Sequence, residues 1–260
     1  MINGKRRIEV RRNEILHLLH NEGMVSVAAL ANKLDVTPAT IRMDLTQLQQ
    51  GGQLVRVQGG AVLPARTDGA WPAVEQADLQ QEKAAIAQVV CSLIRNGDTL
   101  FINSGTTTKC VAEALRGKKD LNVVTNSLAV ATVLGTGGCA RVVLLGGEIN
   151  AQYGFTCGGD AQEQLGRYQA DWVILSCEGI SAKGGITTHH VEEAIIDRMM
   201  IAGAKQVLLA ADHRKIGHVG FAQVCQYDDT YTLVTDARTD EQVIQELEKS
   251  GLKVLRTTNG

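Results

Sequence analysis

Small and hydroxyl-bearing residues follow one of the apolar runs in the middle of this 260-residue chain. The run at 99–102 is rich in β-forming residues, and Ser104, Gly105, Thr106 and Thr107 come shortly after it, ahead of a helical stretch. Backbone amides at the start of a helix, together with nearby hydroxyl groups, suit the oxygens of a phosphate dianion. The pattern therefore predicts a site that binds a phosphorylated small molecule.

Four further polar clusters also stand at the ends of β-rich runs. They are Thr125-Asn126, Gly146-Gly147, Glu178-Gly179-Ile180 and Asp212-His213-Arg214-Lys215. Strands of a parallel sheet end at one edge, and ligands of open α/β sheets bind beyond that edge. A single small-residue turn after a strand is usually only a turn, but five such clusters at one edge favour a ligand site.

The elements that must position these clusters alternate along the second part of the chain. Helical stretches lie near 108–116, 127–134 and 190–204, and a last helix is expected to begin at Thr239, with Gln242 completing a capping box. Alternation of β-rich and helical segments is typical of a mostly parallel α/β sheet. The predicted strands are 99–102, 122–125, 142–145, 172–175, 207–210, 232–235 and 253–255.

A second chemical feature is a short helix that is expected to begin at Pro38. Thr37 is a suitable N-cap, and proline fits the first helical position, where no amide hydrogen bond is needed. An apolar stripe leaves other side chains near the N-terminal end, where a helix-turn-helix contacts base edges in the major groove. An ordinary amphipathic surface helix is the alternative. The stripe consists of Ile41, Leu45 and Leu48, and the remaining side chains are Ala39, Thr40, Arg42 and Met43.

The neighbouring segments favour the helix-turn-helix. Helices are expected over 8–22 and 27–34, and Ser26 is a suitable N-cap for the second. Short β-rich runs on either side of Gly59-Gly60 predict a hairpin after the third helix. Three helices followed by a hairpin are the plan of a winged helix.

Charge and composition divide the chain into a head and a body. Residues 1–66 hold 9 basic and 5 acidic residues, whereas the remainder holds 17 basic and 23 acidic residues. A basic head on an acidic body favours nucleic-acid binding by the head alone. Pro64 and Pro72 lie in a stretch of turn-forming composition. The predicted domains are therefore 1–63 and 80–260, joined by a linker at 64–79. A helix is expected to begin at Gln80, with apolar residues at helical spacing at positions 84, 86, 87, 90 and 93.

Composition also bounds the compartment. The chain has no apolar run long enough to span a bilayer, and the charges throughout residues 1–24 argue against a secretory signal. Its six cysteines include no CxxC pair, so reduced thiols are expected in place of a disulfide framework or a zinc site. We expect a cytoplasmic protein that does not enter membranes.

Four segments of the head carry a recognisable pattern: RNEIL at 12–16, VSVAALA at 25–31, VTPATIRMDL at 36–45 and RVQGGA at 56–61. In these segments the head resembles the DNA-binding domain of the DeoR family of bacterial repressors of sugar metabolism. Met43 stands where the family usually has a second arginine and Gln58 where it usually has a histidine, which implies an altered operator preference. The resemblance implies DNA contacts by Thr37, Pro38, Ala39, Thr40, Arg42, Met43, Arg56 and Gln58.

The polar clusters of the body are similar to those of the effector domain of the same family. That resemblance implies a fold like that of ribose-5-phosphate isomerase, with the loop at 104–107 binding the phosphate of a phosphorylated sugar or polyol. Lys215 is implied as the cation that faces the ligand. Asn103 replaces a usual aspartate and His190 a common asparagine, and both could tune which sugar fits. The implied effector residues are Asn103, Ser104, Gly105, Thr106, Thr107, Thr125, Asn126, Gly146, Gly147, Gly179, His190, Glu193, Asp212 and Lys215.

Two alternatives compete with a ligand-controlled repressor. The first is an isomerase-type enzyme with a fused DNA-binding head, although a winged helix has no role in such an enzyme and Asn103 removes one carboxylate. Its acid–base groups would be Glu192, Glu193, Asp212 and Lys215.

The second alternative is a metal site. Its ligands would come from His189, His190, Glu193, His213 and His218. The adjacent His189 and His190 cannot point the same way from one regular element, and metal-ligand spacing is absent. We therefore predict a homo-oligomeric, DNA-binding repressor of a carbohydrate-utilisation operon, controlled by a phosphorylated sugar or polyol. We predict no catalytic residue, metal or cofactor.

Overall fold

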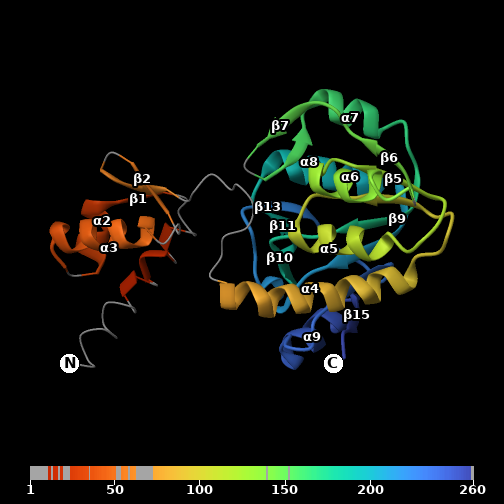
Figure 1. Cartoon of the computed structure of the whole chain (residues 1–260). Coiled ribbons are helices and arrows are strands. Elements are labelled where there is room, and N and C mark those ends of the chain that lie inside the picture. The colour runs from red at the N-terminus through yellow and green to blue at the C-terminus, as the bar shows by residue number, and fades with distance from the viewer. Residues whose placement is uncertain are drawn as a thin grey trace. The chain divides into compact units, whose positions relative to one another are not determined.

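The computed structural model of the chain contains two compact units, Met1–Gln76 and Ala77–Gly260 (Figure 1). Each unit has its own hydrophobic core. No helix in the described part of the chain is both long enough and apolar enough to cross a membrane. The structure describes residues 11–12, 14–16, 18–19, 24–34, 36–50, 54–57, 59–62, 73–138, 140–151 and 153–258.

The first unit is a winged helix, as predicted. Residues 11–12, 14–16 and 18–19 are helical and precede two further helices. Ser26 Oγ accepts a hydrogen bond from the amide of Ala29 at 3.1 Å, as its expected capping role requires. The elements are β1 (Met24–Ser26), α2 (Val27–Lys33), α3 (Pro38–Gln50), β2 (Val55–Val57) and β3 (Gly60–Val62).

Strand β1 adds a third strand to the hairpin that the sequence predicted. The strands are antiparallel and lie in the order β1-β3-β2. A Cβ atom at Gly60 would lie 2.1 Å from the carbonyl oxygen of Val25, so only glycine lets β1 and β3 approach this closely. The core of this unit includes Ile15, Leu19, Leu30, Ile41, Leu45 and Leu54.

The second unit is built on a seven-stranded, wholly parallel sheet in the order β15-β14-β12-β9-β4-β5-β6. This confirms the expected α/β architecture. All seven predicted strands are present, with ends that differ from the predicted ones by a few residues. The strands are β4 (Thr99–Ile102), β5 (Leu121–Thr125), β6 (Ala140–Leu144), β9 (Ala170–Leu175), β12 (Ala204–Ala210), β14 (Tyr231–Thr235) and β15 (Lys253–Arg256).

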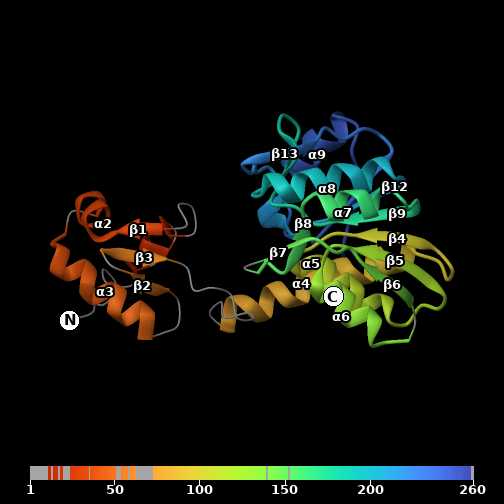
Figure 2. The same cartoon turned by 90° about the horizontal axis from the view of Figure 1, so that it is seen from above.

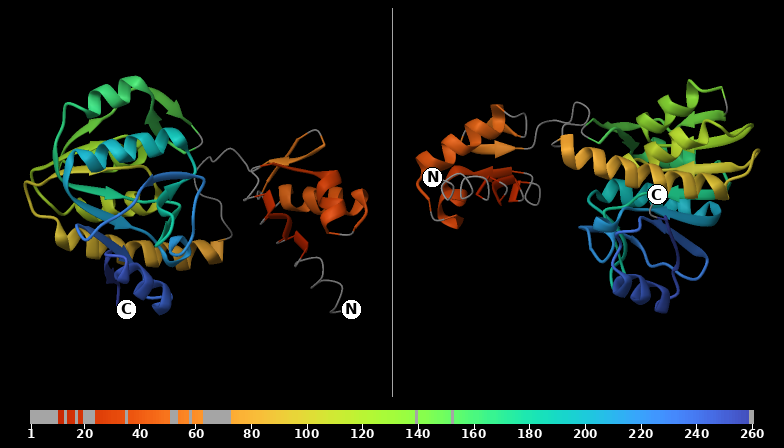
Figure 3. Two further views of the ribbon diagram at one scale, coloured as in Figure 1. Left: turned by 180° about the vertical axis from the view of Figure 1, so that it is seen from behind. Right: turned by 60° about the horizontal axis from the view of Figure 1, so that its bottom comes forward.

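Helices cover both faces of this sheet. In Figure 2, α7 and α8 lie on one side of the strands, and α4, α5 and α6 lie on the other. The view from behind in Figure 3 shows α8 in front of the sheet. The helices are α4 (Ala73–Leu93), α5 (Thr106–Leu115), α6 (Leu128–Gly135), α7 (Gly159–Leu165), α8 (Val191–Ala202), α9 (Glu241–Lys249) and the 3-10 turn η1 (His213–Lys215).

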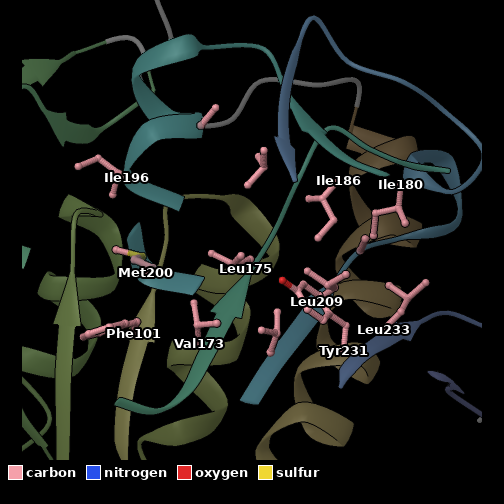
Figure 4. Packing of buried hydrophobic residues seen from close by; sticks show 14 of the residues in the cluster. Phe101, Val173, Leu175, Ile180, Ile186, Ile196, Met200, Leu209, Tyr231 and Leu233 are labelled. Carbon is pink, nitrogen blue, oxygen red and sulfur yellow. The ribbon is translucent and has the colours of Figure 1, made fainter. Parts of the chain in front are cut away.

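Alternate residues of each buried strand supply two separate cores. Phe101 and Val173 pack with Met200 of α8 on one face, as Figure 4 shows. Leu100 of β4 and Val90 of α4 belong to the core on the opposite face. A strand whose successive side chains point to opposite faces reads as a continuous apolar run when both faces are covered.

Two small antiparallel sheets were not foreseen from the sequence. One pairs β7 (Glu148–Asn150) with β8 (Phe155–Cys157). The other has the order β10-β11-β13, with β10 at Gly179–Ser181, β11 at Gly185–Thr188 and β13 at Ala222–Cys225. Both consist of strands of three or four residues, which are too short to give a clear alternating pattern.

Two predicted boundaries are wrong. Helix α4 begins at Ala73, not at Gln80, so residues 73–79 of the predicted linker are helical. The N-cap of α9 is Asp240, whose carboxylate accepts from the amide of Gln242 at 2.7 Å. The hydroxyl of Thr239, the predicted cap, instead donates to the carbonyl oxygen of Asp236. A carboxylate competes well for this position because it is at least as good a cap as a threonine hydroxyl.

Candidate functional site

The parallel sheet brings all five predicted polar clusters to one edge. The clusters follow β4, β5, β6, β9 and β12, and every one of these strands runs in the same direction. From β4 the chain proceeds outward to β5 and β6, whereas β9 lies on the other side of β4. Loops that leave neighbouring strands in opposite directions open a crevice, where ligands of such sheets bind.

The loop after β4 has the features expected of a phosphate site. Helix α5 begins at Thr106, its N-cap is Gly105, and no side chain caps it. The first amides of a helix have no partner within the helix and carry partial positive charge. A Cβ atom at Gly105 would lie 2.0 Å from Ser176 Oγ, so glycine is needed for this loop to lie against the loop after β9. Ser104 and Thr107 are buried, and Thr106 is exposed.

A lysine that the sequence analysis did not single out lies beside this loop. Lys83 Nζ donates a hydrogen bond to Thr106 Oγ1 at 2.8 Å. Lys83 belongs to α4, whose start was predicted at Gln80. The helical spacing of 84, 86, 87, 90 and 93 was visible in the sequence, but nothing in it indicated that Lys83 faces the loop.

Asn103 connects three elements below the loop. Its side-chain amide donates to the carbonyl oxygen of Ser176 at 2.9 Å and to both carboxylate oxygens of Asp197 at 3.1 and 3.2 Å. Its side-chain oxygen accepts from the amide of Ser176 at 2.9 Å. Asn103 is fully buried, so its contacts are internal to the fold. Its predicted role toward a ligand remains a prediction.

Glu193 of α8 lies next to this network. Its carboxylate accepts from Ser104 Oγ at 2.9 Å and from Thr188 Oγ1 through a short hydrogen bond. Burial raises the pKa of Asp197 well above its ordinary value, and the charge of Glu193 raises it further, while the hydrogen bond from Asn103 opposes the rise. Two acidic groups, one with two hydroxyl donors and one with an amide donor, therefore lie under the predicted phosphate loop.

Two predicted effector residues present buried polar atoms with no hydrogen-bond partner among the described residues. They are Asn126, through Oδ1, and His190, through Nε2. Asn126 Nδ2 donates to the carbonyl oxygen of Thr156 at 3.3 Å, which fixes the amide. The His190 ring packs against Tyr153, with ring centres 4.4 Å apart. Buried polar atoms cost free energy unless they are paired, so both atoms are candidates for contacts with ligand hydroxyls.

Thr125 and the predicted glycines have structural roles. Thr125 Oγ1 donates to the carbonyl oxygen of Ile102 at 2.6 Å. The amide of Gly146 donates to Gln164 Oε1 at 3.0 Å. A Cβ atom at Gly147 would lie 2.4 Å from the carbonyl oxygen of Cys157, and one at Gly179 would lie 2.4 Å from that of His218. The contacts of Thr125, Gly147 and Gly179 account for these residue types without a ligand, and the predicted binding roles stay predictions.

The cluster after β12 is dominated by ion pairs. Arg214 donates to both carboxylate oxygens of Asp212, at 3.0 and 3.2 Å. Burial opposes ionisation of Asp212, but the hydrogen bond from Arg214 and the charges of Arg214, Lys215 and Lys83 together outweigh it, so the pKa of this carboxyl is lowered. Lys215, implied as the cation that faces the ligand, forms a short ion pair with Glu178.

The residues of the metal-site alternative do not gather into one cluster in the described part of the chain. The only group of candidate ligands found there consists of Glu82, His213 and Asp236, whose ligand atoms lie within 4.8 Å of one another. Arg238 Nη1 already lies 2.8 Å from Glu82 Oε1 and supplies positive charge to the group. This arrangement is that of an ion-pair network.

Six of the eight predicted DNA-contacting residues lie at the N-terminal end of α3. Thr37 Oγ1 accepts from the amide of Thr40 at 3.2 Å and so caps the helix as expected. Met43 is 71% exposed, and Pro38, Ala39 and Arg42 are exposed as well. Gln58 lies outside the described residues. Arg42 and Met43 line a shallow hollow with Thr46 and Gln47.

Other contacts of α3 fix its orientation within the first unit. Arg56 of β2 donates to Thr46 Oγ1 at 2.9 Å, which ties the wing to the helix. The buried Asp44 accepts from Arg11 at 2.6 Å and from Arg12 at 2.9 Å. The sequence analysis did not foresee this role of Asp44, because a charged residue between apolar helix positions reads as solvent-exposed.

Comparison with known families gives matches to both units. Residues 11–67 match the DeoR-like helix-turn-helix domain, and residues 79–237 match the DeoR C terminal sensor domain. The chain is 34% identical over 240 residues to the glycerol-3-phosphate regulon repressor of Escherichia coli (strain K12), across 91% of this chain and 94% of the relative. It is 31% identical over 250 residues to the HTH-type transcriptional repressor GlcR of Bacillus subtilis (strain 168), across 96% of each.

Solved structures give weaker similarity. Ribose 5-phosphate isomerase A from Neisseria gonorrhoeae aligns with a TM-score of 0.38 and 13% identity, across 54% of this chain and 53% of the isomerase. The translation initiation factor eIF-2B of Pyrococcus horikoshii OT3 aligns with a TM-score of 0.42 and 15% identity, across 80% of this chain and 66% of that protein.

The family matches cover the winged helix and the parallel-sheet unit in the order in which they occur, and the two relatives extend across nearly the whole chain. Both of these relatives are named as repressors, which supports the regulator over the enzyme that competed with it. The chain is a member of the DeoR family of bacterial transcriptional regulators.

Proposed function

We propose that this DNA-binding regulator represses a carbohydrate-utilisation operon and releases its operator when a phosphorylated sugar or polyol binds the sensor domain. The observation that carries the proposal is the uncapped start of α5 at Thr106, with Lys83 Nζ 2.8 Å from its hydroxyl. Helix amides, a hydroxyl group and an ammonium group together suit a phosphate dianion. The repressor from Escherichia coli is named for glycerol 3-phosphate, itself a phosphorylated polyol.

The sugar or polyol moiety of the effector would lie toward Asn126 and His190. Both present a buried polar atom that lacks a partner among the described residues, and the hydroxyl groups of a polyol can satisfy such atoms. Glu193 lies close to the same loop through its bond from Ser104. We assign the operator contacts to the exposed end of α3, with Arg42 reading bases and Arg56 in the wing.

We further propose that the protein works in the cytoplasm as a homo-oligomer. A regulator of chromosomal operons must reach DNA, and one winged helix makes a small interface. Symmetric oligomers can present two winged helices to paired half-sites. The sensor domain is the larger apolar unit and would carry the self-association.

The experiment is a thermal-shift screen of the full chain against phosphorylated sugars and polyols, sn-glycerol 3-phosphate included, with operator binding followed by fluorescence anisotropy. The expected result is a ligand that raises the unfolding temperature and lowers operator affinity at the same concentrations. The unphosphorylated counterpart of each hit is the matched control and should do neither. Stabilisation without any change in operator affinity would contradict the proposed control of DNA binding.

A further inference from the structure

Lys83 differs from the other cations at this edge of the sensor domain. Arg214 is held by both oxygens of Asp212, and Lys215 is paired with Glu178. The contact of Lys83 is to the hydroxyl of Thr106, a neutral group. Among these three described cations, Lys83 is therefore the one whose charge is not matched by a carboxylate in direct contact.

The environment of Lys83 disfavours an isolated charge. The side chain is half-buried, and this burial lowers the pKa of its ammonium group, with Arg214 and Lys215 acting in the same direction and Asp212 acting against them. An anion at the loop would offset this cost, since an opposite charge within a few ångströms favours the charged form of a lysine. The uncapped amides of α5 favour an anion at the same place.

We propose that Lys83 is a phosphate-binding residue of the effector site, so that α4 forms part of that site. The inference rests on the proposed function and adds a ligand contact to it. Lys83 of α4 contacts the hydroxyl of Thr106 at the start of α5. A phosphate bound to the first amides of α5 would therefore lie within reach of Lys83 Nζ. The ion pair between Lys215 and Glu178 can persist while the ligand is bound, because Lys83 supplies the charge.

The position of Lys83 in the chain gives this contact a consequence for regulation. The division between the two compact units falls within α4, between Gln76 and Ala77. Lys83 lies on the same continuous helix, less than two turns beyond that point. A ligand that binds Lys83 therefore acts directly on the helix that leads from the DNA-binding unit into the sensor domain.

The test measures phosphate binding by full-length variants. Inorganic phosphate and sn-glycerol 3-phosphate are the probes, titrated by calorimetry at low ionic strength. Loss of one charge-assisted hydrogen bond should weaken binding of both probes by about ten- to a hundredfold in Lys83→Met. Lys83→Arg should keep most of the affinity because it keeps the charge. Lys109→Met is the matched control, because it removes an exposed lysine one helical turn after Thr106 on α5. This variant should change the affinity for both probes by less than about twofold.

Three outcomes are informative. Weak binding by Lys83→Met, with affinities near wild type in Lys83→Arg and Lys109→Met and with unchanged unfolding temperatures of all ligand-free variants, supports the inference. Wild-type affinity in Lys83→Met, together with weak binding by Thr106→Ala, would overturn the role of Lys83 and leave the phosphate loop in place. Absence of binding of either probe by the wild-type protein would overturn both the inference and the phosphate site of the proposed function.

Discussion

The side-chain amide of Asn103 donates to both carboxylate oxygens of Asp197, at 3.1 and 3.2 Å, in the interior of the sensor domain. Both side chains are buried, and the amide is the donor that the carboxylate needs. An aspartate, the residue that the resemblance to the family implies at position 103, has no donor when ionised. An amide at position 103 can donate to an ionised Asp197, whereas a carboxyl group there would require one of the two acids to keep a proton.

Asn103→Asp should destabilise the protein at neutral pH. Two buried carboxyl groups this close cannot both ionise, so one of them must keep the proton that an exposed carboxyl group loses at pH 7. We expect a loss of about 2–4 kcal/mol in the free energy of unfolding at pH 7 and a smaller loss at pH 5. Urea denaturation at both pH values provides the measurement. Asn122→Asp, at an exposed position of β5, is the control, and an equal loss in both variants would contradict this account.

Asp197→Asn should change how stability depends on pH. The pKa of Asp197 is raised in the folded state by burial, so this group contributes stability below its unfolded-state pKa of about 4 and loses it as pH rises through the folded-state value. The variant removes that dependence while its side-chain oxygen can still accept from Asn103. Relative to wild type, the free energy of unfolding of the variant should increase as pH rises from about 4 to 7. A difference between the two proteins that does not vary with pH would contradict the assignment.

Thr106→Ala should remove the response to effector without removing DNA binding. The hydroxyl accepts from Lys83 and stands at the uncapped start of α5, so its loss leaves phosphate oxygens under-bonded. Ligand affinity should fall about ten- to a hundredfold, and operator affinity without ligand should stay at its wild-type value. Calorimetry and operator anisotropy measure the two quantities. Thr132→Ala on α6 is a suitable control, and wild-type release by Thr106→Ala would place the effector elsewhere.

Arg42→Ala and Arg56→Ala should affect DNA binding in different ways. Arg42 is exposed on α3 near the end that we propose reads bases, and its loss should cost about 1–3 kcal/mol at the cognate operator and relax the sequence preference. Arg56 lies in the wing, and its loss should weaken binding to all sequences and reduce the salt dependence. Arg167→Ala, in the sensor domain, should leave both properties unchanged. Unaltered operator affinity in both head variants would contradict the assigned DNA-binding surface.

The sensor domain should self-associate without the head. Residues 73–260 contain the whole of α4 and both cores of the sheet unit, so this fragment retains the packing of its compact unit. Sedimentation velocity at micromolar concentration should give the same oligomer for the fragment and for the full chain. A monomeric fragment beside an oligomeric full chain would move the association to the head.

The sequence predicted the architecture well because its main signals were local. Buried parallel strands are continuous apolar runs, and Thr37-Pro38 marks a helix start by its own chemistry. The shared polar edge then followed from parallel topology, whereas the order of the strands within the sheet was not predicted. The predicted strand 99–102 coincides with β4.

The missed features depend on contacts between distant segments. Lys83 and Thr106 are 23 positions apart, and their contact depends on how α4 packs on the sheet. Asp44 reads as a solvent-exposed residue, but in the structure it is a buried acceptor for Arg11 and Arg12. The first turns of α4 follow Pro72 directly, and a proline beside polar residues favoured a linker over a helix.

The continuous course of α4 also limits how regulators of this family can be recombined. Ile86, Ala87 and Val90 of α4 are part of the core of the sensor domain, yet the helix already begins at Ala73. A hybrid protein joined at residue 79 would receive this helix without its first turns and with a foreign sequence that ends about one helical turn before Lys83. Exchange of DNA-binding heads between such proteins should therefore use a junction that precedes Ala73, so that the sensor domain keeps α4 entire.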